Sequence, residues 1–383
     1  MELALKLVSL TAVAVPILLA SVVGAETPSP QDLRSLLQPI LKKYDLPALA
    51  GAIVTSHGLV AVGAVGVRKY GTNTPVAIND QFHLGSDTKA MTATMLATLV
   101  EEGKLSWGTT LEQAFPDLGK TMDPAYRKVT LEEMLAHRAG FTDESWPKGK
   151  NLSDMYQLPG TPSEQRRAYV AMILAEPPVS EPGTKFLYSN RSYAVAGAMA
   201  EAVADDSWEN LMRKRLFLPL GMDSCGFGAM GTVGAIDEPW QHTLLLNWHR
   251  AIAPGPQADN APVIGPAGTV HCSIVDWAKF VQAQLRGERG ETGILKPETF
   301  KRLHTPPLGG DYGFGWMVVE RSWAGGRALT HSGSNTMNYA TVWMAPAKDF
   351  AVLVMTNQAG GDTFQACDET ASALIHKFAD GTK

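Results

Sequence analysis

Two pairs of strand-like segments, one near each end of the chain, constrain the fold most strongly. These apolar runs, rich in Ala and Val, cover residues 50–55, 59–67, 339–345 and 350–356. The first pair is joined by Ser56-His57-Gly58 and the second by a turn at residues 346–349, so each pair predicts a hairpin. Helical apolar patterns occupy residues 33–41 and 363–377. Because residues 86–286 are mostly helical or loop-like, we expect one sheet built from the two termini.

The expected fold class is therefore α/β (α+β), with an antiparallel sheet flanked by helices and a mostly helical inserted lobe. Two segments of that lobe, residues 141–162 and 231–266, lack periodicity and are dense in Gly and Pro. They either frame a pocket or are plain surface excursions. The expected boundaries are about 31–85 and 295–378 for the α/β lobe, about 86–294 for the helical lobe and 26–383 for the whole domain.

An apolar run at the N-terminus indicates export. Lys6 precedes apolar residues 7–23, which end in small residues up to Ala25 before a polar segment. This pattern is typical of a secretory signal peptide, here residues 1–25, cleaved after Ala25. The alternative is an uncleaved anchor, since about 17 apolar residues approach the minimum for a bilayer span. Either way we expect the rest of the chain to be periplasmic or secreted.

Charge and metal-binding patterns exclude several function classes. The net charge is −5 over 383 residues and no basic stripe is present, which argues against nucleic acid as a partner. His242 and His249 lack a carboxylate partner at metal-ligand spacing, and no His-Glu-x-x-His or Cys-x-x-Cys occurs. We expect no metal, no cofactor and a small-molecule or peptide substrate, and the oligomeric state is not predicted.

The three cysteines are Cys225, Cys272 and Cys367. An odd, sparse set in an exported chain permits one disulfide at most and leaves one thiol free. Cysteine also behaves as a small apolar residue, and the sequence favours three buried thiols over a disulfide.

Ser86 and Lys89 stand at the start of a long helical pattern that stops at Gly103. Residues at i and i+3 share one helix face, so the lysine amine can lie beside the serine hydroxyl. A serine hydroxyl becomes a good nucleophile when an adjacent base takes its proton. A second Ser-x-x-Lys at residues 145–148 serves as a control, because Pro147 prevents one helical face there. The first pair therefore predicts an acyl-transfer nucleophile.

Two further clusters have a use in such chemistry. Tyr188-Ser189-Asn190 offers a phenol that can shuttle protons if a nearby ammonium lowers its pKa, and an amide that can hold a substrate amide. His331-Ser332-Gly333 precedes a predicted strand, and its glycine would let a substrate backbone lie close to an edge strand. His137 is expected to brace a loop through hydrogen bonds rather than to act as a base.

These motifs, in this order, resemble the serine β-lactamase-like, penicillin-recognising hydrolases. The resemblance is to the class C-like branch, which includes class C β-lactamases, D,D-peptidases, D-aminopeptidases and related esterases. It covers about residues 32–378 and implies a β-lactamase/transpeptidase-like fold. Flanking segments that match are Phe82-His83-Leu84-Gly85, Gly103-Lys104-Leu105, Leu135-Ala136-His137-Arg138-Ala139-Gly140, Pro182-Gly183, Pro266-Ala267-Gly268 and Tyr312-Gly313-Phe314-Gly315-Trp316.

The resemblance also implies roles in a two-step acyl-enzyme reaction. Ser86 would be the acylated nucleophile, Lys89 its activating amine and Tyr188 the general base and acid. The backbone N–H groups of Ser86 and Ser334 would form the oxyanion hole, a feature that accelerates acyl transfer by about 100- to 1,000-fold.

The substrate-binding residues implied by the resemblance are Asn190, His331 and Gly333. Asn190 would hold the substrate amide and Lys89, and His331 would line the site from the edge strand. Most class C β-lactamases carry lysine at the position of His331. Histidine, with an ordinary pKa of about 6.5, supplies less positive charge for a substrate carboxylate, which disfavours an efficient β-lactamase.

The sequence thus predicts an exported serine hydrolase that cleaves an amide or ester, peptidase- or esterase-type, with a D-amino-acid peptide of the cell wall among the candidates. A class C-like β-lactamase is the alternative enzyme. A non-catalytic penicillin- or peptidoglycan-binding module is the alternative of another class, although binding alone would not require a serine-activating pair. The chain has no Gly-x-Ser-x-Gly, and Tyr188-Ser189-Asn190 stands where a class A enzyme would have Ser-Asp-Asn.

Overall fold

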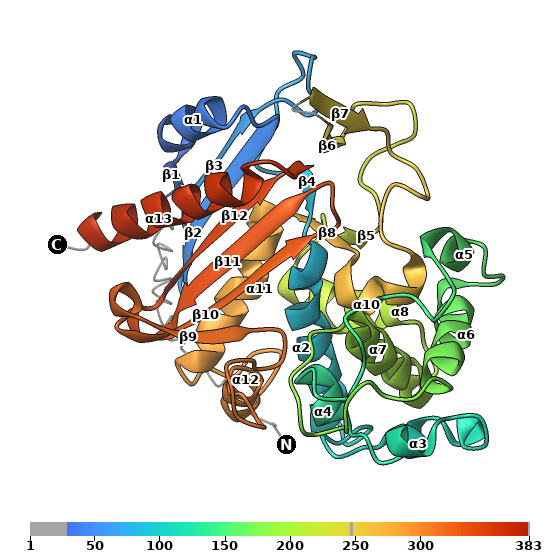
Figure 1. Cartoon of the computed structure of the whole chain (residues 1–383). Coiled ribbons are helices and arrows are strands. Elements are labelled where there is room, and N and C mark those ends of the chain that lie inside the picture. The colour runs from blue at the N-terminus through green and yellow to red at the C-terminus, as the bar shows by residue number, and fades with distance from the viewer. Residues whose placement is uncertain (1–28, 246–247, 382–383) are drawn as a thin grey trace, which may run out of the picture.

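A seven-stranded sheet forms one half of the computed structural model, which describes residues 29–245 and 248–381 (Figure 1). Its order is β1-β3-β2-β12-β11-β10-β9, and every neighbouring pair is antiparallel except β1 with β3. The prediction of one sheet built from both termini is confirmed. The strands are β1 (Gln31–Asp32), β2 (Ala48–Thr55), β3 (Gly58–Gly66), β9 (Met317–Arg321), β10 (Gly326–Ser334), β11 (Tyr339–Ala345) and β12 (Phe350–Thr356).

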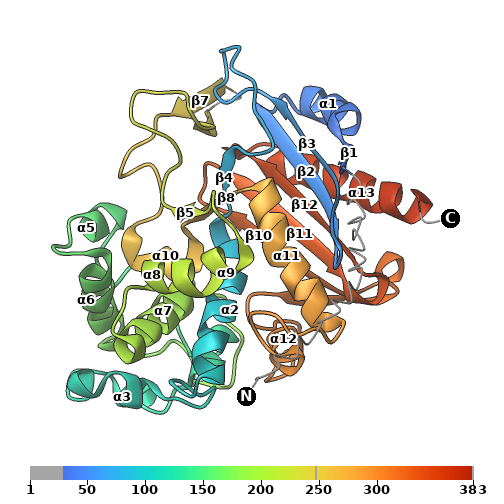
Figure 2. The ribbon, with the colours of Figure 1, turned by 180° about the vertical axis from the view of Figure 1, so that it is seen from behind.

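Helices cover both faces of this sheet. α1 (Arg34–Lys43) and α13 (Thr363–Gly381) lie on one face, and α11 (Ile274–Glu288) lies on the other, as the view from behind shows (Figure 2). Successive strand residues point to opposite faces, so Val352 packs toward α1 and α13 while Leu353 packs toward α11. α11 falls within the range predicted for the helical lobe, yet it packs against β2, β3 and β12.

The other half consists of helices around α2 (Thr88–Glu101), which is buried along most of its length. The predicted stop at Gly103 agrees with its φ of +73°, a conformation that glycine adopts without strain. The surrounding helices are α3 (Leu111–Ala114), α4 (Leu131–Leu135), α5 (Leu152–Tyr156), α6 (Pro162–Leu174), α7 (Asn190–Ala204), α8 (Trp208–Met212), α9 (Leu218–Leu220), α10 (Gly265–Gly268) and α12 (Pro297–Leu303).

Two small sheets were not predicted. The first joins β4 (Gln81–His83), β8 (Val270–Ser273) and β5 (Gly226–Phe227). The second joins β13 (Gln358–Ala359), β6 (Gln241–Leu245) and β7 (Trp248–Ile252). Residues 231–266 therefore contain a hairpin rather than only loops. Strands this short give little periodic signal, and most of their partners lie far away in the sequence.

The first small sheet also explains the cysteines, for which the expectation of three buried thiols is wrong. Cys225 and Cys272 form a disulfide, and Cys367 is a buried free thiol. Gly226 pairs with His271 in the ladder between β5 and β8, which places the two cysteines side by side.

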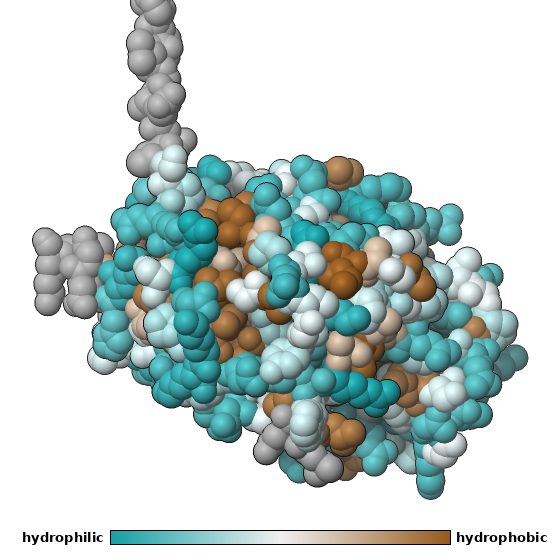
Figure 3. Space-filling model, turned by 90° about the horizontal axis from the view of Figure 1, so that it is seen from above, coloured by the Kyte–Doolittle hydropathy of each residue, from teal (hydrophilic) through white to brown (hydrophobic). Residues whose placement is uncertain are grey.

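The predicted signal peptide, residues 1–25, lies outside the described residues. Within the part of the chain that the structure describes, no helix combines the length and the apolar character needed to cross a bilayer. Seen from above, the surface carries small apolar patches set among hydrophilic residues (Figure 3). Two large exposed apolar side chains, Leu245 and Trp248, belong to the hairpin of β6 and β7.

Candidate active site

Ser86 lies in a 3₁₀ turn, η1 (Gly85–Asp87), that connects β4 to α2. The turn begins with Gly85 at a φ of +50°, and a Cβ at this position would overlap the backbone nitrogen of Ser334. Only glycine fits both demands. The half-buried Ser86 is thus presented at the N-terminal end of a buried helix, against the end of β10.

Lys89 lies one helical turn beyond Ser86, as the i, i+3 spacing predicted, and its side chain is fully buried. Its Nζ lies 3.0 Å from Ser86 Oγ, 2.8 Å from Asn190 Oδ1 and 2.9 Å from the carbonyl oxygen of Ala267. Burial lowers the pKa of Lys89 to about 7. The amine is therefore substantially neutral near neutral pH, where it can accept a proton.

Tyr188 approaches the same two side chains. The Lys89 Nζ lies 4.8 Å from the centre of its ring, and Ser86 is near enough to the hydroxyl to oppose the rise in its pKa. The sequence suggested that an ammonium would lower the pKa of this phenol. That expectation is wrong, because burial raises the pKa of Tyr188 and outweighs the other influences. The group is a neutral phenol that can donate a proton while it accepts another.

Asn190 is the first residue of α7. Its Oδ1 accepts a hydrogen bond from Lys89, and its Nδ2 donates to Ser145 Oγ at 3.0 Å. Ser145 belongs to the second Ser-x-x-Lys, which is not helical, as Pro147 predicted. That control serine nevertheless reaches the site, and no signal in the sequence marked it.

His137 braces the loop that leads to Asn190. It is buried at a φ of +55°, and its Nδ1 accepts a hydrogen bond from the backbone N–H of Ser189 at 3.1 Å. Burial lowers the pKa of His137 well below its ordinary value, so the ring is neutral and able to accept. The prediction of a bracing role is confirmed by this contact.

The third motif lies at the end of β10. β9 pairs with β10 only at residues 326–330, so His331 and the residues after it have a free edge although β9 is the outer strand. A Cβ at Gly333 would overlap the carbonyl oxygen of Leu84. This glycine therefore lets β10 pack against the turn that carries Ser86. The sequence had suggested a different reason for the glycine, the close approach of a substrate backbone. The contact brings the backbone N–H groups of Ser86 and Ser334 to one junction.

The His331 side chain is buried between two residues that the sequence did not single out. Its Nε2 lies 3.2 Å from the Tyr312 hydroxyl, and its Nδ1 lies 3.4 Å from Asp87 Oδ1. Asp87 is the residue directly after Ser86, and burial raises the pKa of its carboxyl group. Both residues stand inside recognised motifs. The pairing of Asp87 with His331 spans 244 positions and that of Tyr312 with His331 spans 19, and neither leaves a local pattern.

His242 and His249, which the sequence analysis considered as metal ligands, contact different residues. His242 Nε2 accepts from the backbone N–H of Tyr70, and His249 Nε2 lies 3.0 Å from Asp45 Oδ2. Among residues 29–245 and 248–381, no group of three or more His, Cys, Asp and Glu side chains could hold a metal ion.

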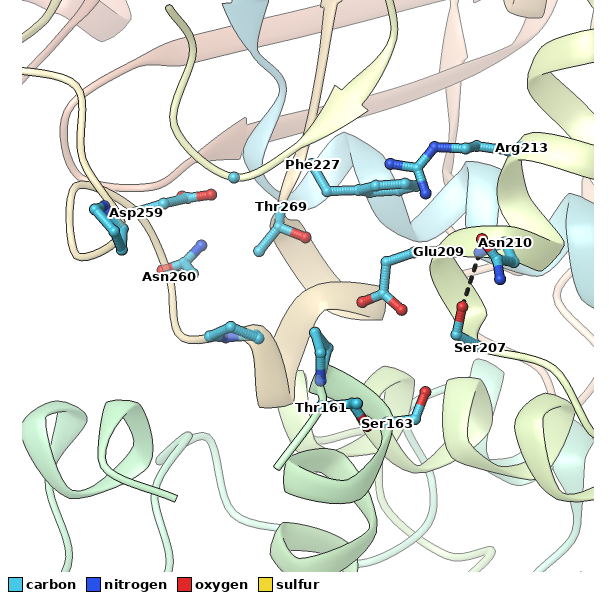
Figure 4. A pocket seen from close by; sticks show the side chains of 14 residues that line it. Thr161, Ser163, Ser207, Glu209, Asn210, Arg213, Phe227, Asp259, Asn260 and Thr269 are labelled. Carbon is cyan, nitrogen blue, oxygen red and sulfur yellow. Dashed lines mark hydrogen bonds between the residues drawn. The ribbon is translucent and has the colours of Figure 1, made fainter. Parts of the chain in front are cut away.

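Two cavities lie near the site without containing Ser86. One of about 550 Å³ is lined by the start of α6, by α8 and by residues next to α10, including Thr161, Arg213 and Thr269 (Figure 4). The other, about 220 Å³, is lined in part by Tyr312, Phe186 and Arg138. Only the smaller cavity includes a direct neighbour of His331.

Comparisons with known proteins identify the family of the chain. The family model described as Beta-lactamase matches residues 33–377. The unguisins hydrolase ungD' of Aspergillus campestris is 25% identical, with 92% of this chain aligned to 65% of the fungal protein. Penicillin-binding protein 4 of Amycolatopsis lactamdurans is 22% identical over 82% of each chain. The chain thus spans slightly less than two thirds of the length of the fungal hydrolases, 65% in each case.

Solved structures share the fold. EstCE1, described as a hydrolase with promiscuous acyltransferase activity, superposes with a TM-score of 0.73 at 18% identity, covering 90% of this chain and 97% of its own. The octameric penicillin-binding protein homologue from Pyrococcus abyssi superposes with a TM-score of 0.71 at 23% identity, covering 90% and 77%. At these identities the likeness concerns the fold alone.

Proposed function

Because the chain belongs to the β-lactamase family, we propose that it is an exported serine hydrolase that cleaves an amide or ester through an acyl-enzyme on Ser86. The observation that carries this proposal is the environment of Lys89. Its Nζ faces two carbonyl-type oxygens, from Asn190 and Ala267, and one hydroxyl, from Ser86. Export rests on the apolar run at residues 7–23.

The hydrogen-bond partners of Lys89 leave the lone pair of its neutral amine for the Ser86 hydroxyl. A neutral amine has two N–H groups, and the oxygens of Asn190 and Ala267 can only accept. Both N–H groups are therefore used there, and the lone pair is left for the Ser86 hydroxyl at 3.0 Å. In this state Ser86 donates its proton to Lys89, which is the arrangement that general-base activation requires.

Acylation then follows in balanced steps. Ser86 Oγ attacks the substrate carbonyl carbon, its proton passes to Lys89, and the carbonyl oxygen takes the negative charge beside the N–H groups of Ser86 and Ser334. As the bond to the leaving group breaks, the proton passes through the Tyr188 hydroxyl to the departing nitrogen or oxygen. The acyl group remains on Ser86.

Deacylation reverses these transfers. Water attacks the acyl carbonyl and loses a proton to the Tyr188 and Lys89 pair, and Ser86 leaves with a proton returned from it. Tyr188 relays protons as a neutral phenol, which agrees with the raised pKa of its buried hydroxyl. The substrate class we propose is a small-molecule or peptide amide or ester of the peptidase or esterase type.

Steady-state hydrolysis of 4-nitrophenyl acetate by matched serine variants tests this proposal. We expect Ser86→Ala to lose enzyme-dependent hydrolysis. Ser145→Ala, at the serine of the second Ser-x-x-Lys, should still hydrolyse the ester, with kcat/KM lowered by no more than about tenfold. Full hydrolysis by Ser86→Ala would contradict the proposal. Penicillin G binding without ester turnover by the wild type would instead favour the non-catalytic binding module.

A further inference from the structure

The carboxylate of Asp87, next to the nucleophile, has an unusual environment. The residue is 2% exposed, and neither carboxylate oxygen has a hydrogen-bond donor among the described residues. The nearest charged group is His331, whose Nδ1 lies 3.4 Å from Oδ1. A buried carboxylate without donors is costly, so its protonation state depends on that histidine.

The other ring nitrogen of His331 has an uncharged neighbour. Its Nε2 lies 3.2 Å from the Tyr312 hydroxyl. Burial raises the pKa of Tyr312 well above its ordinary value, so this neighbour is a neutral phenol. Asp87 therefore supplies the charge that faces His331.

The carboxyl group of Asp87 lies close enough to compensate a cation at position 331. Both side chains are buried, and Asp87 Oδ1 lies 3.4 Å from His331 Nδ1. Opposite charges at this separation attract one another more strongly in a buried site than in water.

From this arrangement, and resting on the proposed hydrolase function, we propose that Asp87 is a positioning residue that sets substrate specificity. Its carboxyl group, 3.4 Å from His331 Nδ1, compensates positive charge on the side chain at position 331. The site then selects esters or amides whose leaving group carries no carboxylate, since nothing on this wall offers an uncompensated cation to such a group.

The other charged and titratable groups around the pair fit this proposal. Lys89 is held by Asn190 and Ala267 beside Ser86, and the Tyr188 ring, 6.3 Å from that of His331, is an uncharged phenol. His137, in the loop after α4, packs against Tyr312 and is neutral, because burial lowers its pKa well below the ordinary value. The cavity beside Tyr312 is lined by groups of both signs, Arg138 and Asp311.

The test compares two substrates that differ only in charge, 3-acetoxybenzoate and its neutral analogue 3-acetoxybenzamide. The readout is kcat/KM for 3-acetoxybenzoate divided by kcat/KM for 3-acetoxybenzamide. This ratio does not depend on the fraction of correctly folded enzyme in each preparation. The variants are His331→Lys, Asp87→Asn and the double variant, which form a double-mutant cycle. Asp45→Asn, at a surface aspartate–histidine pair 3.0 Å apart, is the matched control.

We expect wild type to prefer the neutral ester and His331→Lys to change the ratio little, because Asp87 still compensates the new cation. The double variant has an uncompensated ammonium, and its ratio should rise at least about tenfold above that of His331→Lys, the effect of a charge no longer neutralised at short range. Asp45→Asn should leave the ratio unchanged.

Equal ratios in His331→Lys and the double variant would overturn the role of Asp87. If the wild type shows no Ser86-dependent turnover of either ester, the proposed hydrolase function is overturned instead. The failure of the Asp87 role and the failure of the hydrolase function are therefore distinguishable.

Discussion

The two sides of Ser86 are built on opposite principles. On one side Lys89 has two acceptors and one hydroxyl around its Nζ, so every hydrogen and the lone pair has a partner. On the other side Asp87 has no hydrogen-bond donor among the described residues, and its Oδ1 lies 3.4 Å from His331 Nδ1. The first arrangement prepares a base, whereas the second cancels a charge. The difference suggests that one side performs the chemistry and the other selects the substrate.

Removing the amine should have the largest effect. Lys89→Met keeps the length and apolar stem of the side chain but has no base, so kcat/KM for 4-nitrophenyl acetate should fall about 100- to 10,000-fold. Lys89→Arg is the matched control, because its guanidinium keeps the charge and does not deprotonate. Near-wild-type activity of Lys89→Arg would mean that a permanent cation suffices. It would contradict the assignment of Lys89 as the base.

Two tyrosines, one on each side of Ser86, allow a direct comparison. Tyr188→Phe should lower kcat by about 100-fold, since the proton relay to the leaving group is lost. Tyr312→Phe removes only the hydroxyl that contacts His331 Nε2, and should cost less than about tenfold, the range of one neutral hydrogen bond. Steady-state kinetics of both variants measure the contrast. Equal losses would show that the His331 side also takes part in proton transfer.

The pH dependence should follow the lysine. The pKa of Lys89 is lowered to about 7, so below this pH the amine becomes an ammonium and cannot accept the Ser86 proton. For the neutral ester, kcat/KM should therefore fall about tenfold for each pH unit below 7 and level off above it. Pre-steady-state or initial-rate profiles from pH 5 to 9 provide the measurement. An acidic limb that persists unchanged in Lys89→Met would assign it to another group.

The smallest effect should come from Ser145. Ser145→Ala removes the hydroxyl that accepts from Asn190 Nδ2 at 3.0 Å, which loosens the amide that holds Lys89. We expect a two- to tenfold loss in kcat/KM, about the value of one neutral hydrogen bond. Ser153→Ala, in the nearby helix α5, is the control. A loss as large as that of Tyr188→Phe would give Ser145 a direct part in the reaction.

The parts of this molecule that the sequence predicted are those governed by local rules. The hairpins at both termini follow from continuous apolar runs with turns between them, and the Ser86–Lys89 contact follows from one turn of helix. The contact between Lys89 and Asn190, expected only from family resemblance, joins elements about 100 residues apart.

The missed features depend on pairing over distance. β4 meets β8 across almost 190 residues, and the Cys225–Cys272 disulfide depends on that same sheet. Asp87 gave no signal, because its partner His331 comes from the opposite end of the chain. The raised pKa of Tyr188 was also missed, since burial cannot be read from the residues next to it.

The most direct test of the account is to find which side chain becomes acylated. The enzyme is quenched in acid during turnover of 4-nitrophenyl acetate, digested and mapped by mass spectrometry, with Lys89→Met treated in parallel. The account predicts one acetyl group on Ser86 in the wild type and a strongly reduced rate of its formation in Lys89→Met. Acetylation of another residue, or equal rates of labelling of Ser86 with and without the Lys89 amine, would contradict it.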